Sequence, residues 1–391
     1  MEHMTVKETA RRWGVSIRTV NMYLNEGRVA GAIRKDHGWL VPQDAQKPAD
    51  RRRRRSGAGT AQGVQKSFMP ILSLTHTEGK FIEALSTLED EEERSMALAG
   101  RHYFRGEASQ ARVIAEQFFF SKSADIRLSA RWLHAMASIA CGEAEVCGAD
   151  FAEIQREGEC ACDERIRIHS QFIAMLAKVY FHKESADMSS MMRHVERFPD
   201  GVRYFVLYGR AHELYLHRQY RQSVGVVESA LALMREPYPV AAIYLGIVGA
   251  MASISLALSQ EAQEFFDCAW KIATPERYFE PFAEHHGLLQ GLVERKIRAS
   301  QPELYQKICE MVYCFSRGWM KIHNSDSKSK VTDLLTPYEF SIAMLAAKGR
   351  TNKEIAEYMS VSINSVKAYL ATIYQKLGIT KRAQLLSYVN Y

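Results

Sequence analysis

The sequence lacks several features that mark well-known classes of enzyme or secreted protein. No glycine-rich segment ends in Gly-Lys-Ser or Gly-Lys-Thr, which excludes a P-loop ATPase module. The seven cysteines contain no Cys-x-x-Cys pair, and Cys160 and Cys162 form only a weak pattern for a metal site. Because no signal peptide precedes them, we expect free thiols in a reducing cytoplasm, with no metal and no cofactor.

Catalytic constellations are also missing. The acidic residues are scattered, and no Ser-His-Asp or Cys-His arrangement stands out. The 13 histidines stand mostly alone, and the adjacent pair His285 and His286 cannot share one helix face. We therefore expect that the chain is not an enzyme.

One uncharged run, Val240 to Leu258, reaches the length of a membrane-spanning helix. It is rich in Ala, Gly and Ser and falls in register with a helical repeat. These features favour a buried helix, packed closely through Gly246, Gly249, Ala250 and Ser253. We expect no membrane partner.

Charge is distributed unevenly along the chain. Residues 1–66 carry 14 basic and 6 acidic side chains, residues 328–391 carry 9 and 4, and residues 67–327 carry 28 and 35. Basic ends around an acidic centre are typical of DNA-binding modules attached to a body that stays off the DNA.

The two basic ends share one sequence pattern. When residues 6–20 are shifted by 346 positions onto residues 352–366, the residues coincide at seven positions: Lys, Glu, Ala, Val, Ser, Ile and Val. The spacing is that of a helix-turn-helix, with a small Ala where the helices meet and a Ser that caps the second helix. Such motifs place the second helix in the DNA major groove.

Residues 1–48 are expected to form a small winged helix-turn-helix. Thr5 and Glu8 form a capping-box pattern, and Ile17, Val20 and Leu24 form the inner face of the second helix. Two short strands are expected around Asp36-His37-Gly38. The candidate DNA contacts are Ser16, Arg18, Thr19, Asn21, Met22 and Asn25 on the helix, and Arg34, Lys35 and His37 at the tip.

This arrangement resembles the winged helix-turn-helix of the excisionase and MerR-type group, over about residues 3–48. A module that docks protein is the alternative. Residues 49–66 are expected to be a flexible tether. Its five consecutive arginines can neutralise phosphates: Arg51, Arg52, Arg53, Arg54 and Arg55.

Residues 67–323 show helical periodicity and few prolines. A short turn recurs, and the landmark segments end at residues 106, 142, 183, 219 and 259. Helix pairs at this spacing indicate an α-solenoid similar to tetratricopeptide repeats, whose concave surface would bind a peptide, a protein or a small effector.

A polar linker, residues 324–332, precedes a C-terminal module of residues 333–391. Thr336 and Thr351 are expected helix caps, Pro337 stands at a first helical position, and Ser362 caps the recognition helix. The inner face of that helix is predicted to consist of Val366, Leu370, Ile373 and Leu377.

The segment 335–389 resembles the LuxR-type (NarL/FixJ-type) four-helix DNA-binding domain. The matching residues include Leu335-Thr336, Glu339, Gly349, the run 352–356, Val366-Lys367 and Lys376-Leu377-Gly378. The resemblance implies double-stranded DNA as partner and a homodimer through the last helix. The implied DNA contacts are Thr351, Lys353, Ser362, Asn364, Ser365, Lys367, Ala368 and Tyr369. Tyr338, Tyr369 and Ala371 depart from the usual residues, which puts the base preference in doubt.

These features predict a mainly α, cytoplasmic, one-component transcription regulator of bacterial type, in which the helical repeats sense an effector. The strand–helix alternation of a phosphoacceptor domain is missing from the middle of the sequence. The alternative is a scaffold or adaptor in which the repeats hold a protein partner and the N-terminal module docks protein.

Overall fold

The computed structural model describes residues 3–13, 17–25, 29, 31–35, 38–43, 45, 47, 67–183, 186–323, 335–359 and 361–386. The chain forms two compact units, residues 1–64 and 65–391. The described residues are mainly helical, as the sequence predicts, and their strands belong to the first unit. The predicted linkers 49–66 and 324–332, and with them Arg51–Arg55, lie outside the described residues.

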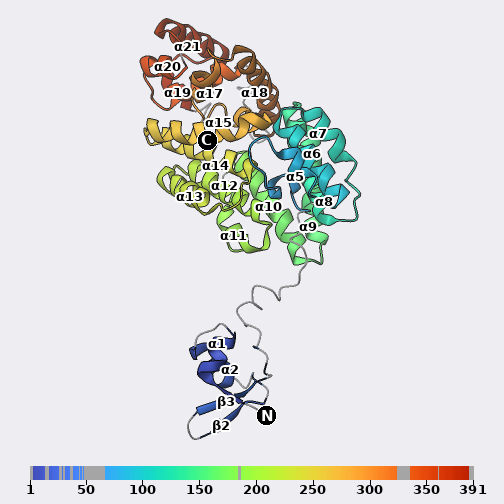
Figure 1. Ribbon diagram of the computed structural model, residues 1–391. Helices are drawn as coiled ribbons and strands as arrows, with labels where there is room; N and C mark the ends of the chain where they lie inside the picture. Colours follow the sequence, from blue (N-terminus) through green and yellow to red (C-terminus); the bar gives the residue numbers. More distant parts are fainter. Residues whose placement is uncertain are drawn as a thin grey trace. The chain divides into compact units, whose positions relative to one another are not determined.

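The first unit combines two helices with a small antiparallel sheet of order β1-β3-β2 (Figure 1). Its elements are β1 His3–Thr5, α1 Val6–Trp13, α2 Ile17–Asn25, β2 Ile33–Lys35 and β3 Gly38–Pro42. The predicted capping box is present: the backbone N–H of Thr5 donates to Glu8 at 2.8 Å, and that of Glu8 to the Thr5 hydroxyl at 3.3 Å. The two predicted strands are confirmed, whereas β1 was not predicted.

The core of this unit corrects one sequence-based expectation. Val20 and Leu24 are buried as predicted, but Ile17 is 49% exposed. Ile17 is the first residue of α2, and the core covers that helix only from Val20 onward. Tyr23, which was not predicted to lie on the inner face, is buried.

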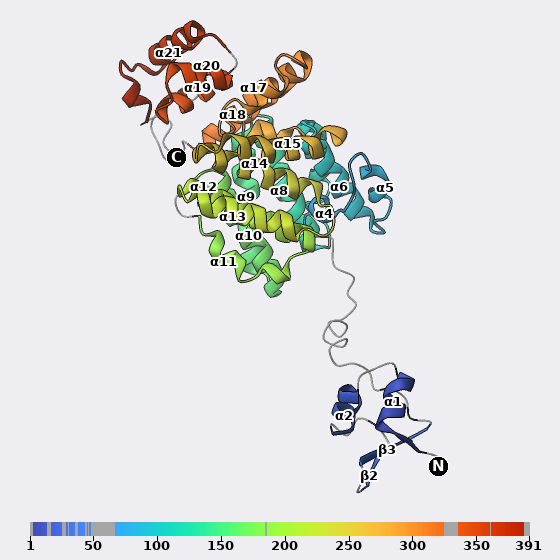
Figure 2. The same cartoon turned by 60° about the vertical axis from the view of Figure 1, so that its left-hand side comes forward.

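The second unit begins with a helical body, in which helices that follow one another along the chain pack side by side (Figures 1 and 2). Its first elements are α4 Pro70–Ser73, α5 Phe81–Leu85, α6 Glu91–Phe104, α7 Ala108–Glu116, α8 Ala124–Ala140, α9 Ala144–Cys160, α10 Glu164–Tyr180, α11 Met188–Met192, the 3-10 helix η1 Val195–Arg197, α12 Asp200–Leu216, α13 Tyr220–Leu233, α14 Pro239–Ser255 and α15 Ser259–Glu276.

The same turn closes the first helix of each successive pair. It contains one residue in the left-handed conformation, and these residues are Gly106, Gly142, His182, Arg218 and Ala257. In each turn the next N–H donates to a carbonyl five residues earlier, as from Glu143 to Ser138 and from Gln219 to Leu214, both at 2.8 Å. This is the Schellman end of a helix. The predicted spacing of helix pairs is therefore confirmed, while the likeness to tetratricopeptide repeats stays a prediction.

The uncharged run of the sequence forms α14, which is buried along its length. A Cβ on Gly246 would lie 2.9 Å from the Cβ of Ala269, and one on Gly249 would lie 2.9 Å from the ring of Phe265. Both neighbours belong to α15, so the predicted close packing through these glycines is confirmed. No helix in the described part of the chain is long and apolar enough to cross a membrane.

The body continues with α16 Glu280–Glu284, α17 Leu292–Ile297 and the long helix α18 Pro302–His323. Helix α18 crosses the turns of three successive helix pairs. Met311 lies against Gly106, Gly318 against Ile139, and the indole N–H of Trp319 donates to the carbonyl of Tyr180 at 2.7 Å. The turn ends of these pairs are therefore covered by the chain itself, which limits the surface that a partner of the body could use.

A buried ion pair holds neighbouring helix pairs together. The carboxylate of Asp125 on α8 accepts hydrogen bonds from the guanidinium of Arg165 and from Nδ1 of His169 at 2.7 Å, both on α10. Burial alone would raise the pKa of Asp125, but the hydrogen bond from His169 and the charges of His169 and Arg165 outweigh it and lower that pKa.

Asp125→Asn should lower the free energy of unfolding by about 2–3 kcal/mol, less than for a fully buried pair because the Arg165 side chain is 33% exposed. The Asp125 pKa is lowered on folding, so its contribution is complete above the unfolded pKa of about 4 and is lost as the pH falls through the folded pKa. Urea unfolding at several pH values should show a smaller acid destabilisation in the variant. Asp200→Asn, which alters the exposed pair with Arg203, is the control and should change little.

Candidate nucleic-acid interface

Two of the C-terminal helices of the second unit, α19 and α20, begin with capping boxes. The elements are α19 Pro337–Ala347, α20 Asn352–Met359, α21 Ile363–Leu377 and the 3-10 helix η4 Arg382–Leu385. Thr336 caps α19, where its hydroxyl accepts from the Glu339 N–H at 3.2 Å. Thr351 caps α20 in the same way, with the Glu354 N–H at 3.2 Å. Both caps are therefore confirmed.

Glu339 has a second role beyond the cap. Its two carboxylate oxygens accept from Nζ of Lys376 at 2.8 and 2.7 Å, which ties α19 to α21. Burial would raise the pKa of Glu339, but the hydrogen bonds from Lys376 and Thr336 lower it, so the group is held ionised. The start of α19 thereby fixes the position of α21.

The candidate recognition helix, α21, begins and ends where the sequence predicts. The hydroxyl of Ser362 accepts from the Ser365 N–H at 3.0 Å, and Gly378 adopts the left-handed conformation with φ 63° just after the last turn. The predicted inner face is confirmed as buried: Val366, Leu370, Ile373 and Leu377. The opposite face of α21 is consequently presented outward.

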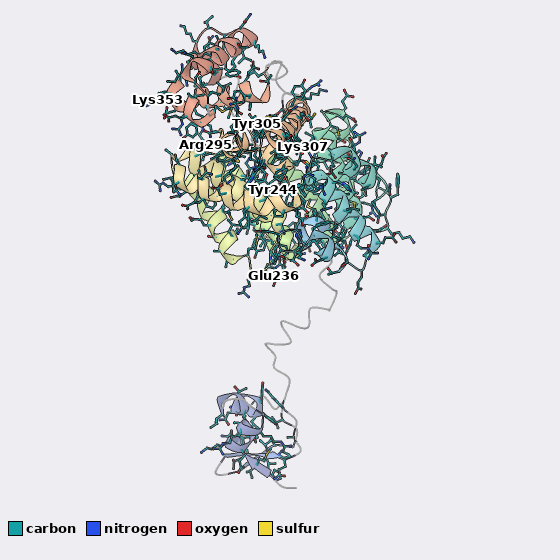
Figure 3. The ribbon with its side chains drawn as sticks, turned by 45° about the horizontal axis from the view of Figure 1, so that its top comes forward. Glu236, Tyr244, Arg295, Tyr305, Lys307 and Lys353 are labelled. Carbon is teal, nitrogen blue, oxygen red and sulfur yellow. The ribbon has the colours of Figure 1, made fainter. Side chains whose placement is uncertain are left out.

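That outer face holds several of the predicted DNA contacts. Asn364, Lys367 and Ala368 are exposed on the first two turns of α21, and Lys353 is exposed on α20. Figure 3 shows Lys353 at the outer edge of these helices, away from Tyr244 inside the body. The arrangement brings polar and basic side chains to the N-terminal end of a helix, where backbone N–H groups favour phosphate.

The other predicted contacts already have structural roles. The hydroxyls of Thr351 and Ser362 form the helix caps described above, and the Thr351 hydroxyl also donates to Glu354 at 2.8 Å. The hydroxyl of Ser365 lies 2.8 Å from that of Ser362. The ring of Tyr369 is half-buried and lies 5.1 Å from that of Tyr338. The side chains of these residues stabilise the helices of the candidate interface and are less available for direct contact with DNA.

Sequence reasoning missed one candidate on this face. Ile363, the first residue of α21, is 43% exposed between the cap Ser362 and Asn364. An aliphatic side chain at the entry of a recognition helix can contact a thymine methyl group in the major groove. The sequence does indicate that Ile363 is exposed, because Ile363 does not belong to the inner-face series that begins at Val366.

In the N-terminal unit, the structure describes fewer of the predicted DNA contacts as exposed. Thr19 and Asn21 are half-buried, whereas Asn25 and Arg34 are exposed. The guanidinium of Arg34 lies 5.9 Å from the ring centre of Trp39 on the neighbouring strand. Ser16 and His37, and the side chains of Arg18, Met22 and Lys35, lie outside the described residues.

The C-terminal helices also contact the helical body. Arg298 of the body donates to the hydroxyl of Tyr338 at 3.0 Å and to the carbonyl of Met359 at 3.2 Å. Arg350 donates to the carbonyl of Ile254 at 3.4 Å, and the guanidinium of Arg295 lies 5.4 Å from the ring centre of Tyr358. Burial raises the pKa of Tyr338 to about 12, so this hydroxyl stays neutral in the contact.

Comparison with known proteins fits this geometry. Residues 333–389 match the family model described as bacterial regulatory proteins, luxR family. These residues form a LuxR-type helix-turn-helix domain. At Tyr338, where the usual residue of such domains is replaced, the structure shows the contact with Arg298 of the body.

The curated relatives are similar to part of this chain. The transcriptional regulatory protein LiaR of Bacillus subtilis (strain 168) is 29% identical over 96 residues, which are 25% of this chain and 43% of that protein. The response regulator protein VraR of Staphylococcus aureus (strain NCTC 8325 / PS 47) is 34% identical over 70 residues, 18% of this chain and 34% of that protein. The chain thus spans less than half the length of either relative. No solved structure gives a significant match.

Among the described residues, no group of three or more His, Cys, Asp or Glu side chains could hold a metal ion. Cys160 and Cys162, the pair singled out in the sequence, are exposed free thiols near the end of α9. The LuxR-type domain and its relatives support a DNA-binding regulator.

Proposed function

We propose that this chain is a one-component transcription regulator of the cytoplasm, whose LuxR-type domain binds promoter DNA and whose helical body senses an effector. The observation that carries the proposal is the outer face of α21. Its first turns present Ile363, Asn364 and Lys367 to solvent while the inner face is buried on a capped scaffold. A helix held in this way can enter a major groove without rearrangement.

The side chains of this face divide into two roles. Lys367, Ala368, Asn364 and Ile363 would read base edges, while Lys353 and the N-terminal backbone of α21 would contact phosphate. Thr351, Ser362, Ser365 and Tyr369 would support these contacts, with their backbone groups near the phosphates. Direct reading thus rests mainly on four neighbouring positions of one helix.

The N-terminal unit is proposed to make a second DNA contact, through Asn25, Arg34 and the other DNA contacts predicted from the sequence of residues 1–48. The tether Arg51–Arg55 would add phosphate contacts and set the distance between the two half-sites. The proposed homodimer would form through the last helix, where Leu386 is 48% exposed. The alternative function, an adaptor whose body holds a protein partner, is favoured if α21 proves dispensable.

Lys367→Ala should lower the affinity of the full chain for its selected promoter fragment about tenfold, because it removes one charged contact in the groove. The fragment is first selected from genomic DNA by the full-length protein at fixed moderate salt. Electrophoretic mobility shift then gives the affinity at several salt concentrations. Lys271→Ala, which removes the same charge from an exposed position on α15, should bind as the unsubstituted chain does.

Equal affinities for the two variants would overturn the DNA-reading role of α21 and favour the adaptor. A chain of residues 67–391 belongs in the same series, since it retains the second compact unit apart from its first two residues. If it keeps the sequence preference but protects a shorter stretch of DNA, the N-terminal unit is a second contact. If it protects the same stretch, that unit does not bind DNA.

A further inference from the structure

A cavity lies where the helical body meets the LuxR-type domain. Its volume is about 50 Å³. The cavity therefore has room for a few waters or a small ligand. Its walls include Tyr180, His212, Glu284, Phe315, Trp319 and Phe340.

The hydrogen bonds beside this cavity fix where the protons are. Nδ1 of His285 lies 2.8 Å from the carbonyl of Pro281, which can only accept, so this nitrogen carries the hydrogen. Nε2 of His285 is then an acceptor, and the Tyr208 hydroxyl, 3.2 Å away, donates to it. The oxygen of Tyr208 in turn accepts from Nδ1 of His212 at 3.2 Å.

These hydrogen bonds leave Nε2 of His212 as an acceptor to which no donor is bonded. Burial lowers the pKa of His212 well below its ordinary value and that of His285 to about 4, so both rings are neutral at physiological pH. Nε2 of His212 has no hydrogen-bond partner among the described residues, and the residue is 2% exposed. Because Nδ1 is turned to Tyr208, which does not line the cavity, Nε2 is the edge that faces the cavity.

The carboxyl group in the wall is already provided with donors. Glu284 accepts from the hydroxyls of Tyr103 and of Tyr244, the latter at 2.6 Å. Burial raises the pKa of Glu284, although these hydroxyls oppose the shift. A cationic ligand is therefore not required to satisfy this group, whereas a donor is required to satisfy His212. The aromatic rings of Phe315, Trp319 and Phe340 supply flat apolar walls.

We propose that this cavity is the effector site of the regulator and takes a small, uncharged, planar molecule bearing one N–H or O–H group. The donor bonds to Nε2 of His212, and the flat body lies among Phe315, Trp319 and Phe340. The assignment rests on the proposed function for its biological meaning, but the binding itself does not involve DNA.

The position of the cavity couples it to the DNA-binding domain. Phe340 belongs to α19, and a Cβ on Gly287 of the body would lie 3.0 Å from its ring, so the ring packs closely against the backbone of the body. The next residue, Ser341, has its hydroxyl 3.3 Å from Nδ1 of His286. A molecule that fills the cavity contacts the LuxR-type domain directly and can change how that domain sits on the body.

Pyrrole and furan test the proposal, because they have the same size and shape and differ in a single N–H donor. Ligand-observed NMR on the full-length chain should show that pyrrole binds about tenfold more tightly than furan. His212→Asn should bind the two alike, because the amide N–H can still donate to Tyr208, while the carbonyl oxygen of this shorter side chain does not reach the position of Nε2. His169→Asn, at another buried histidine with a bonded Nδ1 outside the cavity, should keep the preference.

Equal binding of pyrrole and furan to the unsubstituted chain would overturn the site, as would a preference retained in a folded His212→Asn variant. Thermal melting followed by circular dichroism establishes that each variant is folded. Lys367→Ala should bind pyrrole as the unsubstituted chain does. If the preference holds but the chain selects no DNA, the proposed function fails and the site stands. If DNA binding holds without the preference, the site fails alone.

Discussion

Gly318→Ala should destabilise the second unit by about 3 kcal/mol and lower its melting temperature by about 5–10 °C. Gly318 lies in α18 where this helix crosses α8. A Cβ there would lie 2.2 Å from the carbonyl oxygen of Ile139 and 3.0 Å from its carbonyl carbon and Cα. These are backbone atoms of a buried helix and cannot turn aside as a flexible side chain could. The two helices must separate instead.

The separation would spread along α18. The indole of Trp319 would be drawn away from the carbonyl of Tyr180, to which it donates at 2.7 Å, and Lys321 from the carbonyl of Gly142, 3.3 Å away. Trp319 also lines the proposed effector cavity. The variant should therefore lose the preference for pyrrole along with its stability.

Gly225→Ala is the matched control for this prediction. Gly225 lies inside α13, and an added Cβ would meet nothing within 4 Å. Alanine is the better helix former, so this change should raise the stability by about 0.5–1 kcal/mol. Differential scanning calorimetry of both variants separates the clash from the helix propensity. A melting temperature of Gly318→Ala equal to or above that of the unsubstituted chain would contradict the crossing described.

The sequence predicts the parts of this fold that depend on neighbours along the chain. Thr336, Thr351 and Ser362 cap helices because the partner of each lies three residues away. The buried face from Val366 to Leu377 follows from helical spacing alone, and the recurring turn follows from the Schellman geometry of each helix end. These signals are local, so one sequence carries them.

Contacts between distant segments could not be predicted in this way. Nothing near Gly318 in the sequence indicates that Ile139 lies against it, and the contact of Tyr338 with Arg298 spans 40 residues. Tyr23 rather than Ile17 is buried in the N-terminal core because coverage of a helix depends on its neighbours and not only on its own spacing. The unbonded acceptor Nε2 of His212 is even harder to predict from the sequence, because it depends on the two hydrogen bonds of Tyr208.

Gly291→Ala should release the LuxR-type domain from the helical body while leaving both folded. Gly291 precedes α17 with φ of 87°, and a Cβ would lie 2.2 Å from the carbonyl oxygen of Tyr358 at the end of α20. Hydrogen exchange in the last turn of α20 and in α17 should rise at least tenfold. The core of the domain, including Ile342 and Ile355, is separate and should keep its protection.

Gly349→Ala separates the contact from the backbone strain. Gly349 has nearly the same φ, 82°, but an added Cβ would meet nothing within 4 Å. Both variants have the strain of a left-handed alanine, about 1–2 kcal/mol, and only Gly291→Ala adds the clash with the domain. Similar exchange rates in the two variants would show that Gly291 does not hold the domain.

Release of the domain should change its affinity for DNA less than about threefold, because Asn364 and Lys367 are exposed while the domain is held. Docking therefore does not hide the face that is proposed to read DNA. What docking sets is the position of that face relative to the body, through Gly291, Arg298 and Phe340. An effector that binds beside Phe340 would then change the distance between the LuxR-type domain and the N-terminal unit on a promoter. In Gly291→Ala the effector should bind more weakly, because Phe340 no longer closes the cavity, and it should no longer alter the length of DNA protected.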